Sequence, residues 1–546
     1  MQIDKRNMLL LTLTFGVLMS LPWLVPHMGF VALFGFLPLL FMDRIATRSG
    51  MRRFWGWHYS AFVLWNALTT FWVCNATVGG AIFAILANSF QMSLVFGIYR
   101  LGRKHFSGNV PFIFLVAAWI AWERFYLVSA EISWPWLVLG NAFARSTHMI
   151  QWYEITGTLG GSLWVWLSNI GIFSLTTALI DGKWEKARPI QKIVGVFSLV
   201  TVLVAPIAAS LIIYAHADEG AEGSLDVMIA QPNIDPYHKF QAMDQSEQTA
   251  VLLAQLDEGF REKGGQDSPL LMLAPETFTN DIIVGDYASS HTWRRMLSFL
   301  QDKAGSTILF GASSFEFTEG GPAPSDLARK LNDGRWMRVH NSALTLDSEG
   351  NSEIFHKSKL VVGVEKTPYP KFFTKLDNLV GKMIGMNGGV MGRDEGQDEV
   401  SLLHCGDIPL GCAICYESIY GEYCADFVRK GAKALAVITN DAWWGDTPGY
   451  RQHLSYSCLR AIELRRDIAR CANTGISAFI DSKGDIVSST DWWERRRLDG
   501  KVTLRSDETF FVVHGDIVGR LCSFMFILLI LSLAAQMTMK GKMRKK

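Results

Sequence analysis

Eight stretches of this chain are apolar over roughly the length that a lipid bilayer requires, which is about 20 residues for a helix. They lie at 8–25, 28–43, 58–76, 79–99, 110–128, 162–180, 192–214 and 515–537. Because the hydrocarbon core offers the backbone no hydrogen-bond partners, such segments cross it as helices. The sequence therefore predicts a polytopic α-helical membrane domain of about eight spans, with the last span near the C-terminus.

Clusters of lysine and arginine predict how these spans are oriented. Basic residues gather at 44–53, at 100–104, at 183–192 and in the final KGKMRKK. With eight spans, all four clusters fall on the same side of the membrane, and basic connections favour the cytoplasm. We therefore expect both termini in the cytoplasm. Lys5 and Arg6 precede the first run as in a signal peptide, but no small-residue cleavage site follows, so we expect a retained anchor.

The composition changes sharply after the seventh span, where ADEGAEGS forms a polar linker. Beyond it, short β-type runs such as DVMIA, TILFGA and ALAVIT alternate with helix-like segments. This alternation is typical of a layered α/β domain. We divide the chain into an N-terminal membrane domain (1–217), an extracytoplasmic domain (218–512) and a C-terminal helix with a basic tail (513–546).

Three polar residues lie where apolar runs of the α/β domain end. They are Glu276 in LLMLAPETF, Lys357 in IFHKSKLVV and Cys415 in IPLGCAICYES. A thiol becomes a strong nucleophile when a base removes its proton, and a carboxylate in a dry pocket can be that base. A neighbouring lysine can stabilise negative charge on a carbonyl oxygen. Acyl transfer through a thioester is therefore chemically reasonable.

Each of these residues also has an ordinary interpretation. A buried cysteine is usually a small core residue, and a lysine near Lys359 usually belongs to a solvated face. Cys412 and Cys415 form a C-x-x-C pair, but residues three apart on a strand point to opposite faces, and no second pair has zinc-ligand spacing. The eight cysteines have irregular spacing, which gives no disulfide framework. The net charge of +1 gives no argument for nucleic-acid binding.

The three residues, in this chain order, resemble the Glu-Lys-Cys triad of the nitrilase (carbon–nitrogen hydrolase) superfamily. The combination of several spans before the domain and one after it resembles the narrower bacterial apolipoprotein N-acyltransferase family. Other matching motifs are SWPWLVLGNAFA at 133–144, QPNIDP at 231–236, TNDAWWGDTPGYRQHL at 439–454, ANTGIS at 472–477 and GDIVGR at 515–520.

The resemblance implies an αββα sandwich outside the inner membrane of a bacterium. It implies that Glu276 is the general base, Lys357 the oxyanion stabiliser and Cys415 the acylated nucleophile. It also implies supporting or substrate-binding roles for Glu365, Tyr416, Glu417, Trp443, Trp444 and Phe240. Two departures stand out: the family's Pro-Phe-Gly is replaced by Val-Gly-Val at 362–364, and the aromatic residue expected after the QPN stretch is either Phe240 or Tyr237. Lys359 competes with Lys357 for the lysine's role, but the spacing to Glu365 favours Lys357.

The implied reaction has two steps and needs no cofactor or metal. A phospholipid first gives an acyl chain to Cys415, and the α-amino group of a diacylglyceryl-cysteine at a lipoprotein's N-terminus then attacks the thioester. One alternative is a membrane-tethered amidase that uses water as the acceptor. Another is a transporter or scaffold, which is disfavoured because the spans lack paired interrupted helices and because all three triad residues are present.

Overall fold

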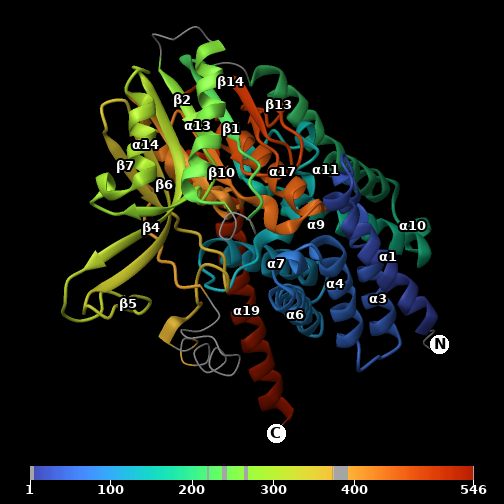
Figure 1. The fold of residues 1–546 in the computed structure, drawn as a ribbon. Helices are drawn as coiled ribbons and strands as arrows, with labels where there is room; N and C mark the ends of the chain where they lie inside the picture. The colour runs from blue at the N-terminus through green and yellow to red at the C-terminus, as the bar shows by residue number, and fades with distance from the viewer. Residues whose placement is uncertain are drawn as a thin grey trace. The chain divides into compact units, whose positions relative to one another are not determined.

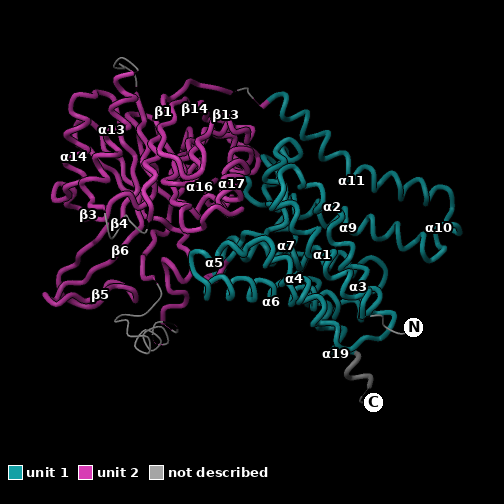
Figure 2. The backbone as a smooth tube through the Cα atoms, turned by 45° about the vertical axis from the view of Figure 1, so that its right-hand side comes forward, with its two compact units in different colours: residues 1–130, 134–216, 514–546 teal, residues 131–133, 217–513 magenta. Residues whose placement is uncertain are grey.

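The computed structural model describes residues 5–217, 220–236, 243–262, 269–371, 373, 375 and 392–544. The chain divides into two compact units (Figure 2). Unit 1 comprises Met1–Ala130, Trp134–His216 and His514–Lys546, and unit 2 comprises Glu131–Ser133 and Ala217–Val513.

Unit 1 is helical, and seven of its described helical segments are long and apolar enough to cross a membrane. They are α1 (Lys5–Leu24), the segment Gly29–Arg48 that contains α2 (Ala32–Gly35) and α3 (Leu37–Arg48), α6 (Val78–Gly102), α7 (Val110–Val128), α9 (Thr158–Ile180), α11 (Pro189–His216) and the Ile517–Met539 part of α19 (Ile517–Arg544). The prediction of a polytopic helical membrane domain is confirmed.

The segment predicted over 58–76 differs from a continuous span. It forms α4 (Trp55–Thr70), which is too short to count among the seven, and a separate turn, α5 (Val73–Ala76). Near the break, the Thr69 and Thr70 hydroxyls donate to carbonyl oxygens four residues earlier, at 2.7 Å each. Such side-chain bonds compete with the helical ladder and bend helices.

Ion pairs join three of the basic connections at one end of unit 1. Arg100 at the end of α6 lies 2.8 Å from Asp43 on α3, and Arg48 at the end of α3 lies 2.8 Å from Asp181 after α9. The ends of these three helices therefore lie together, as expected if their connections emerge on one side of a membrane.

The aromatic segment at 133–144 folds as two short 3-10 helices, η2 (Pro135–Leu137) and η3 (Leu139–Phe143). Trp136 and Phe143 are buried inside unit 1. The amide N–H of Leu139 donates to the buried Glu123 carboxylate on α7, at 2.8 Å. The two rings are therefore part of the packed interior of unit 1.

Unit 2 contains two β-sheets (Figure 1). The first has the order β14-β1-β2-β4-β6-β5, with β3 paired to β4 and β7 paired to β6. Its strands are β1 (Gly223–Gln231), β2 (Leu270–Leu273), β3 (Thr279–Ile283), β4 (Ser306–Thr318), β5 (Arg329–Lys330), β6 (Trp336–Asp347), β7 (Ser352–His356) and β14 (Arg496–Leu504). The second has the order β13-β12-β11-β10-β9-β8. Its strands are β8 (Leu403–Cys405), β9 (Ile408–Ile414), β10 (Ala434–Thr439), β11 (Ile468–Ala472), β12 (Ala478–Ile480) and β13 (Ile486–Ser489).

Helices cover the outer faces of the two sheets. Leu252 and Leu256 of α13 (Gln245–Glu262) and Met296 of α14 (His291–Leu300) enter the apolar core of the first sheet. The second sheet packs against α16 (Gly421–Arg429) and α17 (Pro448–Leu464). Between the sheets, the Cys471 thiol of β11 lies 3.4 Å from the Ala230 carbonyl oxygen of β1. The predicted αββα sandwich is confirmed.

Candidate active site

Cys415 lies at the carboxyl end of β9, where the chain leaves the strand and enters the short helix η6 (Cys415–Ile419). Its φ of 52° lies in the left-handed region, which costs a non-glycine residue about 1–3 kcal/mol. The Ser418 hydroxyl donates to the Cys415 carbonyl oxygen at 2.8 Å. The surrounding structure therefore holds the cysteine in a strained conformation, which is common at functional sites.

The surroundings of Cys415 keep its sulfur protonated. Burial is the main cause that raises the pKa of the thiol well above its ordinary value, and the charge of Glu276 raises it further. The positive charge of Lys357 and a hydrogen bond with Thr439 oppose this rise in the pKa. Because the thiolate is the nucleophilic form, the site needs a base to remove the proton.

Glu276 follows β2 in a loop that is bound to β4 at Gly311. The Gly311 N–H donates to the Pro275 carbonyl oxygen at 3.1 Å, and the Gly311 carbonyl oxygen accepts from Phe278 at 2.8 Å. A Cβ atom at position 311 would lie 2.5 Å from the Glu276 Cα. A side chain at position 311 would therefore displace the backbone of Glu276, and glycine lets the loop lie this close to β4.

Lys357 follows β7, and its ammonium group lies between two carboxylates. Its Nζ is 3.1 Å from Glu276 Oε1 and 2.7 Å from Glu365 Oε1. The Asn341 side-chain amide donates to the same two oxygens, at 2.8 and 2.9 Å. Burial alone would lower the pKa of Lys357, but the two carboxylates raise it well above its ordinary value. The lysine is therefore a charged donor inside the site.

Backbone groups hold the second oxygen of each carboxylate. The Asn440 N–H donates to Glu276 Oε2 at 3.1 Å, and the Val361 N–H donates to Glu365 Oε2 at 2.7 Å. Asn440 directly follows Thr439, whose side chain bonds the Cys415 thiol. These contacts bring Glu276, Lys357 and Cys415 into one site, together with Glu365.

Lys359, the competing lysine, lies elsewhere. Its Nζ is 5.6 Å from the centre of the Tyr420 ring and 5.7 Å from the centre of the Tyr423 ring. Burial lowers the pKa of Lys359. The structure therefore brings Lys357 rather than Lys359 to the two carboxylates.

Glu417 lies beside the nucleophile but is fully engaged by its neighbours. Its carboxylate accepts from the N–H of Ser358 at 2.6 Å, from the N–H of Ile414 at 2.8 Å and from the Tyr423 hydroxyl at 2.6 Å. These bonds join the segment after Lys357 to the end of β9. The neighbouring Tyr416 donates its hydroxyl to the Ser133 carbonyl oxygen at 3.2 Å.

Of the remaining predicted residues, the structure describes Trp443 and Trp444 but not Phe240. Trp443 and Trp444 lie in η7 (Asp441–Trp444), which follows β10. Trp443 is 37% exposed, whereas the Trp444 ring packs edge-on against His453 at 5.3 Å between centroids. Phe240 lies outside the described residues, as does the part of the 370–400 loop at 376–391.

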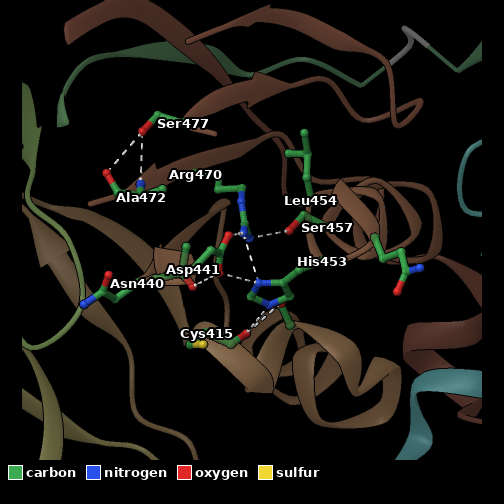
Figure 3. A network of polar contacts seen from close by, with 12 residues as sticks. Cys415, Asn440, Asp441, His453, Leu454, Ser457, Arg470, Ala472 and Ser477 are labelled. Atoms are coloured by element: carbon green, nitrogen blue, oxygen red, sulfur yellow. Dashed lines mark hydrogen bonds and ion pairs between the residues drawn. The ribbon is translucent and has the colours of Figure 1, made fainter. Parts of the chain in front are cut away.

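The structure adds a polar network to which the sequence analysis gave no role. Asp441 after β10, His453 on α17 and Arg470 on β11 are buried beside Cys415 (Figure 3). Asp441 Oδ1 is 2.9 Å from His453 Nδ1, and the Arg470 guanidinium donates to Asp441 Oδ2 at 2.7 Å. Two of these residues lie in the 439–454 motif, so a signal was present, but Arg470 is distant in sequence.

Cys415, Asp441 and His453 also have the spacing of metal ligands, since their ligand atoms lie within 4.8 Å of one another. Each of the two buried residues is already engaged: Asp441 by Arg470 and Thr439, and His453 by Asp441 and the Cys415 carbonyl. The nearby guanidinium supplies the positive charge that balances Asp441.

All eight cysteines are free, so the C-x-x-C pair forms no disulfide.

Two family models match the chain. The carbon–nitrogen hydrolase model matches residues 294–506, and the apolipoprotein N-acyltransferase N-terminal domain model matches residues 15–171. An apolipoprotein N-acyltransferase of Chlorobaculum tepidum is 27% identical over 94% of this chain and 94% of its own length. One of Geobacter metallireducens is 27% identical over 95% of this chain and 94% of its own length. Among solved structures, Nit3 of Saccharomyces cerevisiae, a nitrilase-superfamily member, matches 54% of this chain and 95% of its own, with 11% identity and a TM-score of 0.36.

Proposed function

We propose that this chain, which belongs to the apolipoprotein N-acyltransferase family of membrane-bound carbon–nitrogen hydrolases, transfers a fatty acyl group through a thioester on Cys415. The observation that carries the proposal is the position of Lys357. It is buried, it is bonded to Glu276 and Glu365, and its positive charge lowers the pKa of the Cys415 thiol against the effect of burial. Glu276 as base, Lys357 as cation and Cys415 as nucleophile can therefore act on the same carbonyl group.

In the first half of the reaction, Glu276 takes the proton from the Cys415 sulfur as the sulfur attacks an ester carbonyl of a phospholipid. The C–S bond forms, and the Lys357 ammonium stabilises the negative oxygen of the tetrahedral intermediate. Glu276 then returns the proton to the departing glycerol oxygen as the C–O bond breaks. The products are the Cys415 thioester and a lysophospholipid.

In the second half, the α-amino group of a diacylglyceryl-cysteine attacks the thioester carbonyl. Glu276 takes a proton from the attacking nitrogen, and Lys357 again stabilises the oxyanion. The C–N bond forms, the C–S bond breaks, and the sulfur leaves protonated by Glu276. The products are an N-acylated lipoprotein and the free enzyme.

Both substrates are lipids of a membrane, which agrees with a multi-pass protein. We place it in the bacterial inner membrane with its catalytic unit on the periplasmic side and both termini in the cytoplasm. The ion-paired basic connections of unit 1 support this orientation, provided that the α4–α5 segment also crosses the membrane.

The purified full-length chain, incubated with a phospholipid that carries a radiolabelled acyl chain, tests this function. A synthetic diacylglyceryl lipopeptide with a free α-amine is the acceptor, and the same peptide with an acetylated amine is the control. We expect label on the free-amine peptide alone. Release of labelled fatty acid at the same rate without any acceptor would instead show a hydrolase that uses water.

A further inference from the structure

His453, which is not part of the Glu-Lys-Cys group, contacts the backbone of the nucleophile Cys415. His453 is fully buried, and its Nε2 lies 3.0 Å from the Cys415 carbonyl oxygen. That oxygen only accepts hydrogen bonds, so the contact requires a proton on Nε2. The Ser418 hydroxyl, 3.1 Å from Nε2, already donates to the same carbonyl and can accept from the ring.

Asp441 fixes the orientation of this imidazole ring. His453 Nδ1 lies 2.9 Å from Asp441 Oδ1, and the Thr439 hydroxyl donates to the same oxygen at 2.7 Å. Burial would raise the pKa of Asp441, but His453 and Arg470 lower it to about 2. The Arg470 guanidinium, which only donates hydrogen bonds, lies 3.1 Å from the same Nδ1. Asp441 and Arg470 therefore hold one side of the ring, while Nε2 on the other side contacts the Cys415 carbonyl (Figure 3).

The contact matters because Cys415 is strained. Its left-handed backbone persists only when the surrounding structure holds it. The His453 bond fixes the peptide group that follows the cysteine, and the orientation of this group sets where the sulfur points. Burying charged groups such as Asp441 and Arg470 costs free energy of folding. Their position beside the nucleophile is consistent with a role in holding the geometry of the site.

We propose that His453, oriented by Asp441, is a positioning residue that holds the strained backbone of Cys415 so that its thiol faces Glu276 and Lys357. The proposal rests on the thioester function proposed above. His453 does not take the thiol proton in this arrangement, because Nε2 already carries the hydrogen that it donates to the Cys415 carbonyl, and Nδ1 lies against Asp441 and Arg470. It therefore differs from the histidine base of a cysteine–histidine pair.

Two substitutions at this position form a matched pair. In His453→Gln the side-chain amide nitrogen reaches the place of Nε2 and can still donate to the Cys415 carbonyl. In His453→Asn the amide nitrogen reaches only the place of Nδ1. We expect the rate constant for acylation of Cys415 to fall about 100-fold in His453→Asn, with an unchanged KM for phospholipid. We expect His453→Gln to recover at least about tenfold of that loss.

Alkylation by iodoacetamide, followed by mass spectrometry of the Cys415 peptide, gives a readout that needs no acyl donor. We expect alkylation to be fastest in the wild type, slower in His453→Gln and slowest in His453→Asn. Equal rates in the two variants, or a wild-type rate in His453→Asn, would overturn the proposal. If the wild type takes up no acyl group, the thioester function fails, while the alkylation rates still decide the positioning role.

A further variant covers the case in which His453→Asn does not fold. Asp441→Asn keeps the shape of the side chain but removes the charge that orients the ring. It is expected to slow alkylation of Cys415 relative to the wild type at a temperature where thermal unfolding shows that both proteins are folded. An unchanged alkylation rate in folded Asp441→Asn would also overturn the proposal.

Discussion

Replacing Lys357 by alanine removes the cation that contacts both Glu276 and Glu365. The neighbouring Lys359→Ala is the matched control, because that lysine is also partly buried but contacts two tyrosine rings instead. Both variants lose one positive charge within the same three residues. The comparison therefore separates the position of the charge from its mere presence.

The structure sets the size of the expected effects. The Lys357 side chain is 1% exposed, and its partners Glu276 and Glu365 are 8% and 14% exposed, so water screens these contacts little. Removing one partner of such a buried group destabilises a protein by about 3–5 kcal/mol. Losing the donor that stabilises the oxyanion lowers the rate of the chemical step about 100- to 1,000-fold.

The assay is single-turnover acylation of Cys415 by phospholipid, with thermal unfolding of each variant measured in parallel. We expect Lys357→Ala to show the loss of rate at a temperature where it remains folded, whereas Lys359→Ala keeps a rate close to that of the wild type. Equal losses in the two variants, or an unchanged rate in Lys357→Ala, would refute the assignment of Lys357 as the oxyanion stabiliser.

Three further predictions follow from the contacts of the site. Gly311→Ala places a Cβ 2.5 Å from the Glu276 Cα, so we expect the glutamate to shift and single-turnover acylation to fall about 100-fold; a wild-type rate would show that the loop adapts. The lowered pKa of Asp441, about 2, gives stability that is present above pH ~4 and is lost as the pH falls toward 2, by about 2 kcal/mol. The stability of Asp441→Asn should therefore change less than that of the wild type between about pH 4 and pH 2. The same change in both proteins would contradict this contribution of Asp441. Glu417→Gln should lower the unfolding temperature, because one amide cannot accept all the bonds that the carboxylate accepts; an unchanged temperature would argue against that role.

Patterns within short stretches of sequence predicted the frame of the catalytic unit. The apolar run that ends at Cys415 is β9, and the run before Glu276 is β2. A polar residue directly after a buried apolar strand is a candidate for chemistry, so these residues could be found without a structure. Their proximity could not, because β2 and β9 belong to different sheets. The start of α17 also has a local signal, because the Thr447 side chain caps the helix and Pro448 suits its first turn.

Other parts of the site depend on pairs that no local pattern contains. The strand β11 was not predicted because Arg470 interrupts its apolar run, and the structure buries that arginine against Asp441, 29 residues earlier. Asn341 was also missed, because it is a polar residue within β6 whose two carboxylate partners, Glu276 and Glu365, are far away in the sequence. The role of a buried polar residue in a strand depends on a partner that is distant in the sequence, so the structure is needed to identify it.

The most direct test of the thioester mechanism is the mass of the Cys415 peptide from full-length protein purified with phospholipid and without an acceptor. We predict a fatty-acyl mass increase on this peptide that hydroxylamine removes and that disappears when the lipopeptide amine is added. Cys412→Ala, which changes a buried cysteine on the same strand, should carry the same adduct. An unmodified Cys415 peptide in protein that still acylates the lipopeptide would contradict the mechanism.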